Sequence, residues 1–392
     1  MNLLPIYSVT RVAYAGLSAK CAAPNVHGNI SLTFRYRLSS GQRRMVDGRK
    51  SRGLRRRDLA HGLAAMVTAS VAGQACRSSG KDGSEPLIVG GLPVTCNLTL
   101  PIACTSRRLA KEQGKHSGDL FEYCKFSGWP EIKEALMSGR IQAAFMLAPL
   151  VMDLTTKKVP IKIVSLGHRS GAVIMVGKDS PYKGFKALTG KRIAIPSRFA
   201  VDFLFLRKML KQEGMSPKDV DLVEMPPPDM PAALYAKAVD AYCTGEPFGA
   251  AAEKAGYAIP LRMTRNEWRN YICCVLTVRE ELIDQKRPLV QELVNTVLGA
   301  GTWLDEGQAH RDKGAEIAAG RTFFNQDPSI IKFVMEKPPD RVTYGDLRML
   351  KAEFDELMQL SMEAGTLKEP VPYEQYTDGS FAAVATPAPI II

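Results

Sequence analysis

Residues 87–113 read LIVGGLPVTCNLTLPIACTSRRLAKEQ, and this stretch contains one complete strand, loop and helix. Leu87–Gly91 is an apolar run of the length expected for a buried strand. Pro93–Asn97 supplies turn-forming residues, and a helix is predicted from Leu98 to Gln113. A buried strand that leads into a helix in this way is typical of a parallel sheet covered by helices.

The same alternation continues along the chain and is interrupted twice. Further strands are predicted at 121–126, 142–147, 159–166, 173–176, 191–195, 220–225 and 238–242, with helices at 130–138, 201–213 and 230–237. The alternation breaks near Leu166–Ala172 and again near Thr244–Pro247. Two breaks are what one lobe inserted into another requires. From Glu280 onward the pattern is mainly helical.

These boundaries predict a two-lobed α/β fold with mainly parallel sheets flanked by helices and a helical C-terminal part. A chain of 392 residues with 45% hydrophobic content is too long for one ordinary domain. The predicted parts are a leader over 1–76, a linker over 77–85, a first lobe of 86–167 with 246–370, a second lobe of 168–245, and a loose tail over 371–392.

The net charge of +12 at first suggests nucleic-acid binding. Residues 1–75, however, hold twelve Lys or Arg against two Asp or Glu, whereas the remainder holds forty against thirty-eight. The body of the protein is therefore nearly neutral, and we expect no nucleic-acid partner.

The leader resembles an export signal. Arg56-Arg57-x-Leu59 is similar to a twin-arginine motif, and the weakly apolar run Ala60–Ala75 follows it. Cys76 then stands where a lipoprotein would be cleaved and lipidated, with ordinary cleavage nearby as the alternative. These features predict a periplasmic protein, either anchored to a membrane through Cys76 or free. The structural alternative is a basic, disordered N-terminus.

Eight cysteines stand at 21, 76, 96, 104, 124, 243, 273 and 274. They form no CxxC pair, and no His follows at zinc spacing, so the sequence predicts neither a metal site nor a cofactor. We expect small buried thiols, although an exported protein can also form disulfides that the sequence does not pair.

Four segments together resemble a known family. They are Phe126-Ser127-Gly128-Trp129-Pro130, Leu136–Ala148, Gly190–Ala194 and Cys243-Thr244-Gly245-Glu246-Pro247. Over residues 86–370 the chain resembles the nitrate/sulfonate/bicarbonate-type substrate-binding proteins of ABC importers, most of all the nitrate and bicarbonate branch. The resemblance implies a two-lobed periplasmic-binding-protein clamp of type II, a permease and an ATPase as partners, and no catalysis. It also implies that Trp129 and Glu246 line the cleft.

The strand-to-helix loops are the expected ligand contacts, because ligands bind beyond the carboxyl ends of strands in open sheets. Helix N-termini there favour small anions. We therefore expect a small anion such as nitrate, bicarbonate or a sulfonate, with hinges near Gly167 and Gly245. The predicted contacts are Thr95, Asn97, Ser127, Gly128, Trp129, Ala148, Pro149, His168, Ser197, Arg198, Thr244 and Glu246.

Each of these residues also has a structural explanation. The alternative role for Trp129 is that of a core residue. Glu246 would repel an anion, and it is as well suited to cap a helix or to pair with Arg or Lys. Arg198 is equally a solvated surface charge, His168 a structural residue, and the polar residues of the first loop are common in turns.

Two other classes of protein compete with the importer interpretation. One is an enzyme similar to those that synthesise pyrimidine or thiamine precursors with clustered Cys and His, or a binder of such a precursor. Cys273-Cys274 invites that comparison, but no neighbouring His accompanies the pair in the sequence. The other is a cytoplasmic sensor domain, which the predicted export signal disfavours.

Overall fold

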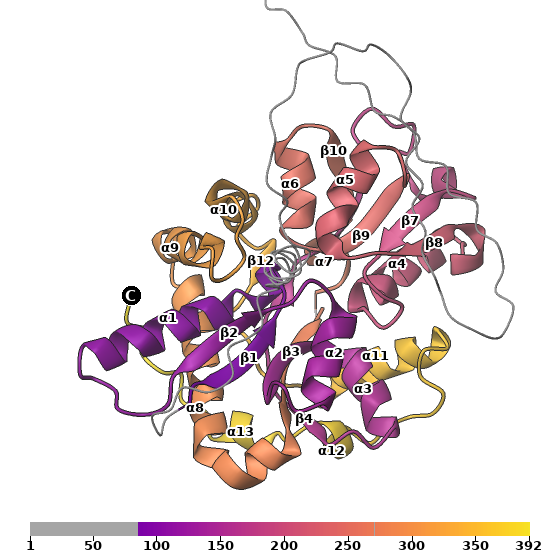
Figure 1. Cartoon of the computed structure of the whole chain (residues 1–392). Coiled ribbons are helices and arrows are strands. Elements are labelled where there is room, and N and C mark those ends of the chain that lie inside the picture. Colours follow the sequence, from indigo (N-terminus) through magenta and orange to yellow (C-terminus); the bar gives the residue numbers. More distant parts are fainter. Residues whose placement is uncertain (1–84, 270) are drawn as a thin grey trace, which may run out of the picture. The chain divides into compact units, whose positions relative to one another are not determined.

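The computed structural model describes residues 85–269 and 271–392, and within this part of the chain two five-stranded sheets form the framework (Figure 1). The first sheet has the order β2-β1-β3-β11-β4, formed by Phe121–Lys125, Leu87–Gly91, Ala143–Leu147, Cys274–Arg279 and Ile161–Leu166. The second has the order β10-β6-β9-β7-β8, formed by Ala258–Met263, Ala172–Gly177, Ala241–Gly245, Arg192–Ile195 and Asp221–Glu224. The predicted two-lobed α/β fold is confirmed.

One strand in each sheet runs against the other four. β11 is antiparallel to both β3 and β4, and β6 is antiparallel to both β9 and β10. Each follows a segment that crosses from the other sheet. A strand that enters from the facing lobe must run away from it, whereas the remaining strands run toward it. Their carboxyl ends therefore meet where the two lobes join.

The crossings lie at 167–171 and 264–273, because β10 still pairs with β6 in the second sheet. The predicted end of the second lobe at residue 245, and the hinge at Gly245, are wrong. Gly245 is a ladder partner of Ala172, and the Gly-Glu-Pro motif is a turn into a helix. β10 escaped prediction because it is a half-buried edge strand, and Pro260 within its short apolar run argues against a strand.

Helices cover the faces of both sheets (Figure 1). On the first sheet, α1 and α8 pack on each other on one side, and α2 and α3 contact β3. On the second, α5 and α6 pack together and α4 contacts β6 and β9. Their bounds are Thr99–Glu112 (α1), Trp129–Met137 (α2), Ala148–Thr156 (α3), Val201–Gln212 (α4), Met230–Tyr235 (α5), Phe248–Lys254 (α6) and Glu280–Asp305 (α8).

The C-terminal part is helical as predicted, but it does not end in a loose tail. Tyr376 and Phe381 are fully buried, and the Asp378 N–H donates to the Ile163 carbonyl at 2.9 Å. Buried aromatic rings therefore hold the segment against β4. The remaining helices are α7 (Thr264–Glu267), α9 (Gln308–Ala319), α10 (Pro328–Glu336), α11 (Lys351–Glu363), α12 (Tyr373–Tyr376) and α13 (Ser380–Ala383).

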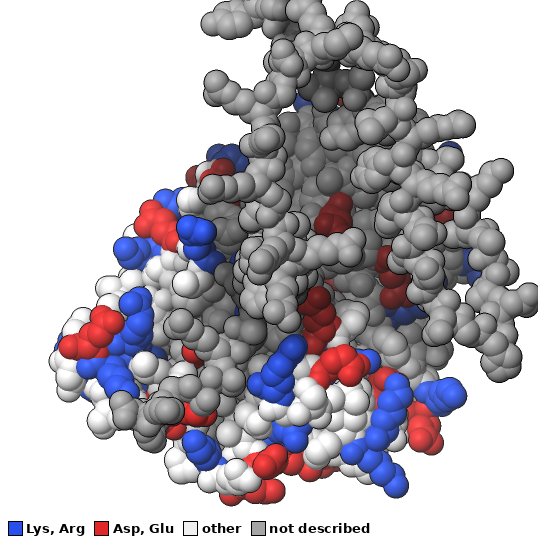
Figure 2. Space-filling view, in the orientation of Figure 1, with Lys and Arg blue, Asp and Glu red and all other residues white. Residues whose placement is uncertain are grey.

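The visible surface mixes the two signs of charge. Figure 2 shows basic and acidic side chains interspersed over the described face, in agreement with the nearly neutral composition of the body. Among the described helices, none combines the length and apolarity needed to cross a bilayer. The predicted leader and Cys76 lie outside the described residues.

A buried ion pair joins the first crossing to the C-terminal part. Arg169, in the two-residue strand β5 (Arg169–Ser170), donates to both carboxylate oxygens of Glu353 at 2.8 and 3.1 Å. Its Nε also donates to the Asp346 carbonyl at 2.6 Å. β5 pairs with β12 (Val342–Thr343), so the crossing is fixed on two sides. Planar, bidentate pairing of this kind is specific to Arg.

We predict that Arg169→Met lowers the free energy of unfolding by about 3–5 kcal/mol, because it leaves the Glu353 carboxylate buried without its partner. Arg348→Met is the matched control, since Arg348 pairs with Asp346 at an exposed position and its loss should cost less than about 1 kcal/mol. Urea unfolding of both variants measures the difference. Equal losses would show that the Arg169 pair does not anchor the crossing.

Candidate functional site

The carboxyl ends of β1 and β9 meet at the junction of the two sheets. Thr95, in the short helix η1 (Thr95–Asn97) after β1, donates its N–H to the Glu246 carbonyl at 2.8 Å and its hydroxyl to the same oxygen at 3.0 Å. Tyr344 donates its hydroxyl to the Thr95 carbonyl at 2.8 Å. These three residues are fully buried. Thr95 therefore joins the lobes, and its hydroxyl already has an acceptor.

Glu246 uses both carboxylate oxygens within the protein. Oε1 accepts from Arg341 Nε at 2.6 Å, and Oε2 accepts from the Ala250 N–H at 2.8 Å in the first turn of α6. Arg341 also donates to Glu253 at 2.8 Å. Glu246 thus caps a helix and pairs with an Arg, which were the structural alternatives to ligand binding. It shapes the junction without an oxygen left over for a ligand.

Several buried donor groups at the junction have no hydrogen-bond partner among the described residues. They are Asn97 Nδ2, Thr99 Oγ1, His168 Nδ1 and Thr244 Oγ1, all on residues with no exposed surface. The amide orientation of Asn97 is set by the Leu92 N–H, which donates to Oδ1 at 2.8 Å. A buried polar group without a partner costs about 1–3 kcal/mol. Such a set is therefore expected where a ligand or ordered water completes it.

These donors come from both lobes and from the segment between them. Asn97 and Thr99 follow β1, Thr244 lies in β9, and His168 lies in the first crossing. Three helices, α1, α3 and α4, also begin after strands whose carboxyl ends face the junction, and their first residues are buried. Positive helix ends and free hydrogen-bond donors favour a small anion.

Thiols and a Tyr–Asp pair lie beside this set. The Cys273 and Cys274 Sγ atoms are 3.9 Å apart, and the Tyr271 hydroxyl donates to Asp202 Oδ1 at 3.0 Å. Burial raises the pKa of Asp202 to about 7, although its bond from Tyr271 lowers it. The thiol contact with Cys274 lowers the pKa of Cys96, but burial and nearby acidic groups raise it further, to about 11. The Cys96 thiol is therefore protonated at neutral pH.

Other predicted contacts lie elsewhere. Ser127 is exposed and donates its hydroxyl to Glu131 at 2.9 Å, which fixes the start of α2 beside Gly128. Trp129 is 5% exposed and packs in the hydrophobic core, which was the structural alternative for it, and its contact with a ligand stays a prediction. The residue's size and its place in the first turn of an amphipathic helix turn it into the core. Ser127 acts as a helix-start residue.

Ser197 and Arg198, which were expected to bind an anion, do not belong to the set of buried donors without partners. Ser197 accepts the Phe199 N–H at 3.2 Å, and Arg198 is half exposed and paired with Glu224 at 3.2 Å. Ala148 does lie at the junction, but its N–H already donates to the Cys273 carbonyl at 3.2 Å. Pro149 follows it and has no N–H to offer.

Sequence reasoning missed Thr99, Asp202, Tyr271 and Arg341. Asp202 and Thr99 stand in the first turns of predicted helices, and an acidic or hydroxyl side chain there resembles an ordinary helix-start residue. Tyr271 lies in a stretch for which no element was predicted. Arg341 has no local signal, because its partners are 95 and 88 residues away.

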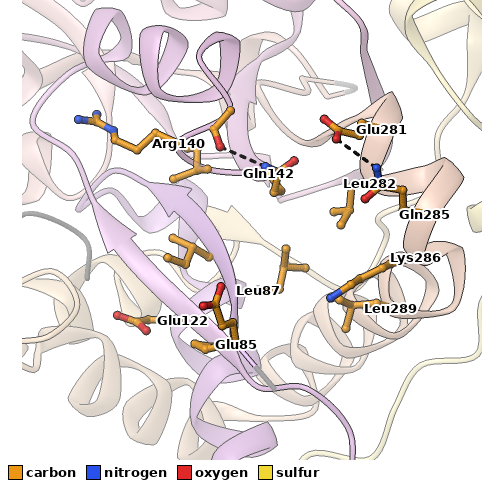
Figure 3. A pocket seen from close by; sticks show the side chains of 14 residues that line it. Glu85, Leu87, Glu122, Arg140, Gln142, Glu281, Leu282, Gln285, Lys286 and Leu289 are labelled. Carbon is orange, nitrogen blue, oxygen red and sulfur yellow. Dashed lines mark hydrogen bonds between the residues drawn. The ribbon is translucent and has the colours of Figure 1, made fainter. Parts of the chain in front are cut away.

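A groove of about 770 Å³ lies at the end of the first sheet that is opposite the junction (Figure 3). Leu87 begins β1 there, and the Gln142 amide donates to the Gly139 carbonyl at 3.1 Å. Figure 3 shows carboxylates of Glu122 and Glu281 on its rim together with Lys286. Because it lies at the amino ends of parallel strands and its charges are mixed, this groove is not the expected ligand site.

Comparison with known proteins agrees with this arrangement. The model described as the NMT1-like family matches residues 80–319. The chain belongs to the NMT1-like family. A curated relative, the nitrate/nitrite binding protein NrtA of Nostoc sp., is 26% identical over 266 residues, which cover 61% of this chain and 59% of that protein. The chain thus spans less than two thirds of this relative's length.

Solved structures show the same fold for this NMT1-like chain. A ligand-binding component of an ABC-type import system from Staphylococcus aureus, solved with zinc bound, has a TM-score of 0.69 and 28% identity over 78% of this chain and 100% of that one. The periplasmic nitrate-binding protein NrtA of Synechocystis has a TM-score of 0.64 and 19% identity over 75% and 85%. The predicted resemblance to nitrate- and sulfonate-type binding proteins is confirmed.

An enzyme also has this fold. The desulfurization enzyme DSZB has a TM-score of 0.55 and 18% identity over 76% of this chain and 98% of that one. At this identity the likeness shows the fold alone. The fold of the NMT1-like chain therefore does not by itself separate binding from catalysis.

We predict that the free energy of unfolding of the wild type falls as the pH rises through neutrality, and that Asp202→Asn removes this fall. The folded pKa of Asp202, about 7, exceeds its ordinary value of 3.8, so the protonated form stabilises the folded state fully below about pH 4. That contribution is lost as the pH rises through 7, by roughly 4 kcal/mol in total. The free energy of unfolding, measured from about pH 4 to 8, should fall less in Asp202→Asn than in the wild type.

The exposed Asp179→Asn is the control and should follow the wild type. The pKa of His168, lowered by burial to about 4, changes stability in the opposite direction. That contribution is present in all three proteins and cancels in the comparison. Parallel curves for Asp202→Asn and the wild type would contradict the prediction.

Proposed function

We propose that this chain is the solute-binding component of an ABC importer and holds a small anion at the junction of its two sheets. The observation that carries this proposal is the set of buried donors without partners at Asn97, Thr99, His168 and Thr244. An anion would accept from all of them at once, and nitrate, bicarbonate or a small sulfonate would offer enough oxygens. The name of the Nostoc relative, a nitrate/nitrite binding protein, supports this class of ligand.

The proposed mechanism is capture between lobes joined by two crossing segments. Movement at 167–171 and 264–273 would open and close the junction, and closure would expel water around the anion. The Thr95 to Glu246 bonds would belong to the closed arrangement. A membrane permease and its ATPase would be the partners. Export to the periplasm, through a twin-arginine signal and with Cys76 as a lipid anchor, is part of the same proposal.

The second candidate function is catalysis on a small molecule, as in enzymes that make pyrimidine or thiamine precursors. The clustering of Cys96, His168 and Cys274 favours it, because their side-chain atoms lie within 4.8 Å of one another. Against it, a nucleophilic thiol needs a lowered pKa, and the pKa of Cys96 is about 11. Incubation followed by mass spectrometry separates the two functions, since a binding protein returns its ligand unchanged.

We predict that Thr244→Val changes affinity and stability in opposite directions. Removal of a hydroxyl that donates to an anion should weaken binding by about 10- to 100-fold. The ligand-free protein should become more stable by up to about 1 kcal/mol, because an unpartnered buried hydroxyl is replaced by a methyl group of similar size. Calorimetric titration with nitrate, bicarbonate and taurine gives the affinity, and thermal unfolding gives the stability.

Ser127→Ala is the matched control, because Ser127 is exposed and bonded to Glu131. Its affinity should equal that of the wild type. If Thr244→Val and Asn97→Ala both bind every anion as tightly as the wild type does, the junction is not the binding site. If the wild type binds none of the three anions, the proposed ligand class is wrong.

A further inference from the structure

Three metal-binding side chains from distant parts of the sequence converge in the junction. Cys96 Sγ, one ring nitrogen of His168 and Cys274 Sγ all lie within 4.8 Å of one another, and all three residues are buried. Cys96 lies in η1, His168 in the first crossing and Cys274 at the start of β11. No sign of a metal site is present in the sequence, because metal-binding residues at the usual short spacings are absent and these three lie far apart along the chain.

The imidazole of His168 is set up to act as a ligand. The Cys274 N–H donates to His168 Nε2 at 3.3 Å, so Nε2 carries a lone pair and Nδ1 carries the proton. That bond is long, and a cation near Cys274 would compete with it easily. Burial lowers the pKa of His168 to about 4, which keeps the ring neutral at neutral pH. A neutral imidazole is the form that binds metals.

The donor set selects a thiophilic cation. Two sulfur atoms and one imidazole suit zinc or copper(I), whereas magnesium and calcium require oxygen ligands. Two thiolates balance the charge of Zn²⁺ completely, but with Cu⁺ one negative charge would remain. A buried net charge is costly. The charge balance therefore favours zinc.

We propose that Cys96, His168 and Cys274 bind one zinc ion. Zinc–sulfur and zinc–nitrogen bonds of about 2.3 and 2.0 Å require the three ligand atoms, which lie within 4.8 Å of one another, to close by about 1 Å at most. Three protein ligands leave the fourth tetrahedral position for water or another small ligand, as in zinc sites that accept an exogenous group. The zinc site does not depend on the proposed transport function, because zinc binding is measured without solute.

Binding would release the two thiol protons. Cys96–SH and Cys274–SH each lose a proton as the two zinc–sulfur bonds form, and the neutral imidazole adds its lone pair without losing one. The thiol pKa values, about 11 for Cys96 and well above 9 for Cys274, mean that both protons are present beforehand. The zinc dissociation constant should therefore fall by about 100-fold for each unit of rising pH near neutrality.

The test uses the reduced, chelator-treated full chain with Cys21→Ser and Cys76→Ser, so that cysteines outside the described residues contribute nothing. Titration with Co²⁺ should give a thiolate-to-cobalt absorption band that saturates at about one equivalent, and Zn²⁺ should displace it. Cys96→Ser, Cys274→Ser and His168→Asn should each weaken binding by at least about 10-fold.

Cys104→Ser and Cys243→Ser are the matched controls, because both thiols are equally buried and neither belongs to the three-residue site. They should keep the cobalt band. Thermal unfolding of each metal-free variant shows whether it folds. For a variant that does not fold, the test is made in the parent chain instead: zinc should protect Cys96 and Cys274 from an alkylating reagent.

Three results would overturn the proposal. These are no cobalt band and no zinc-dependent protection in the folded parent chain, equal loss of the band in the control variants, or binding of Cu⁺ without binding of Zn²⁺. A failure of anion binding in the separate titrations would leave the zinc result unaffected. The two proposals are therefore distinguishable.

Discussion

The hydrogen bonds from Thr95 to the Glu246 carbonyl are the contact on which the arrangement of the site depends. They join the loop after β1 in one sheet to the end of β9 in the other, and both donors are buried. Glu246 is itself held by Arg341 and by the start of α6. The buried ion pair and the helix start therefore fix Glu246, whose carbonyl accepts both bonds from Thr95.

The unpartnered donors at the junction lower the stability of the folded protein unless a ligand or water accepts from them. The donors of Asn97, Thr99, His168 and Thr244 are buried without partners among the described residues, and each such group lowers stability. Burial of the apolar core offsets this cost. Stability alone would replace such donors with apolar side chains, so their presence supports the proposed binding of a ligand.

The alternation of strands and helices was predictable because each element has a local signal. Leu87–Gly91 and Val201–Gln212 appear in the structure nearly as their apolar patterns predict. Elements without such a signal were missed, above all β10, an edge strand with Pro260. Because β10 was missed, the return crossing was predicted at Thr244–Pro247, whereas the chain crosses at 264–273. A turn within one lobe and a passage between lobes have similar local sequences.

The sequence by itself determined the α/β class, the two lobes and the loop in which Thr95 and Asn97 stand, because strand and helix periodicities are local properties of the chain. Only the tertiary structure decided which polar side chains meet. It turned Trp129 into the core, paired Arg198 with Glu224, gave Glu246 to Arg341, and brought Cys96, His168 and Cys274 together. Pairing between residues that lie 26 to 178 positions apart depends on how the sheets cross and pack, and no local pattern encodes that.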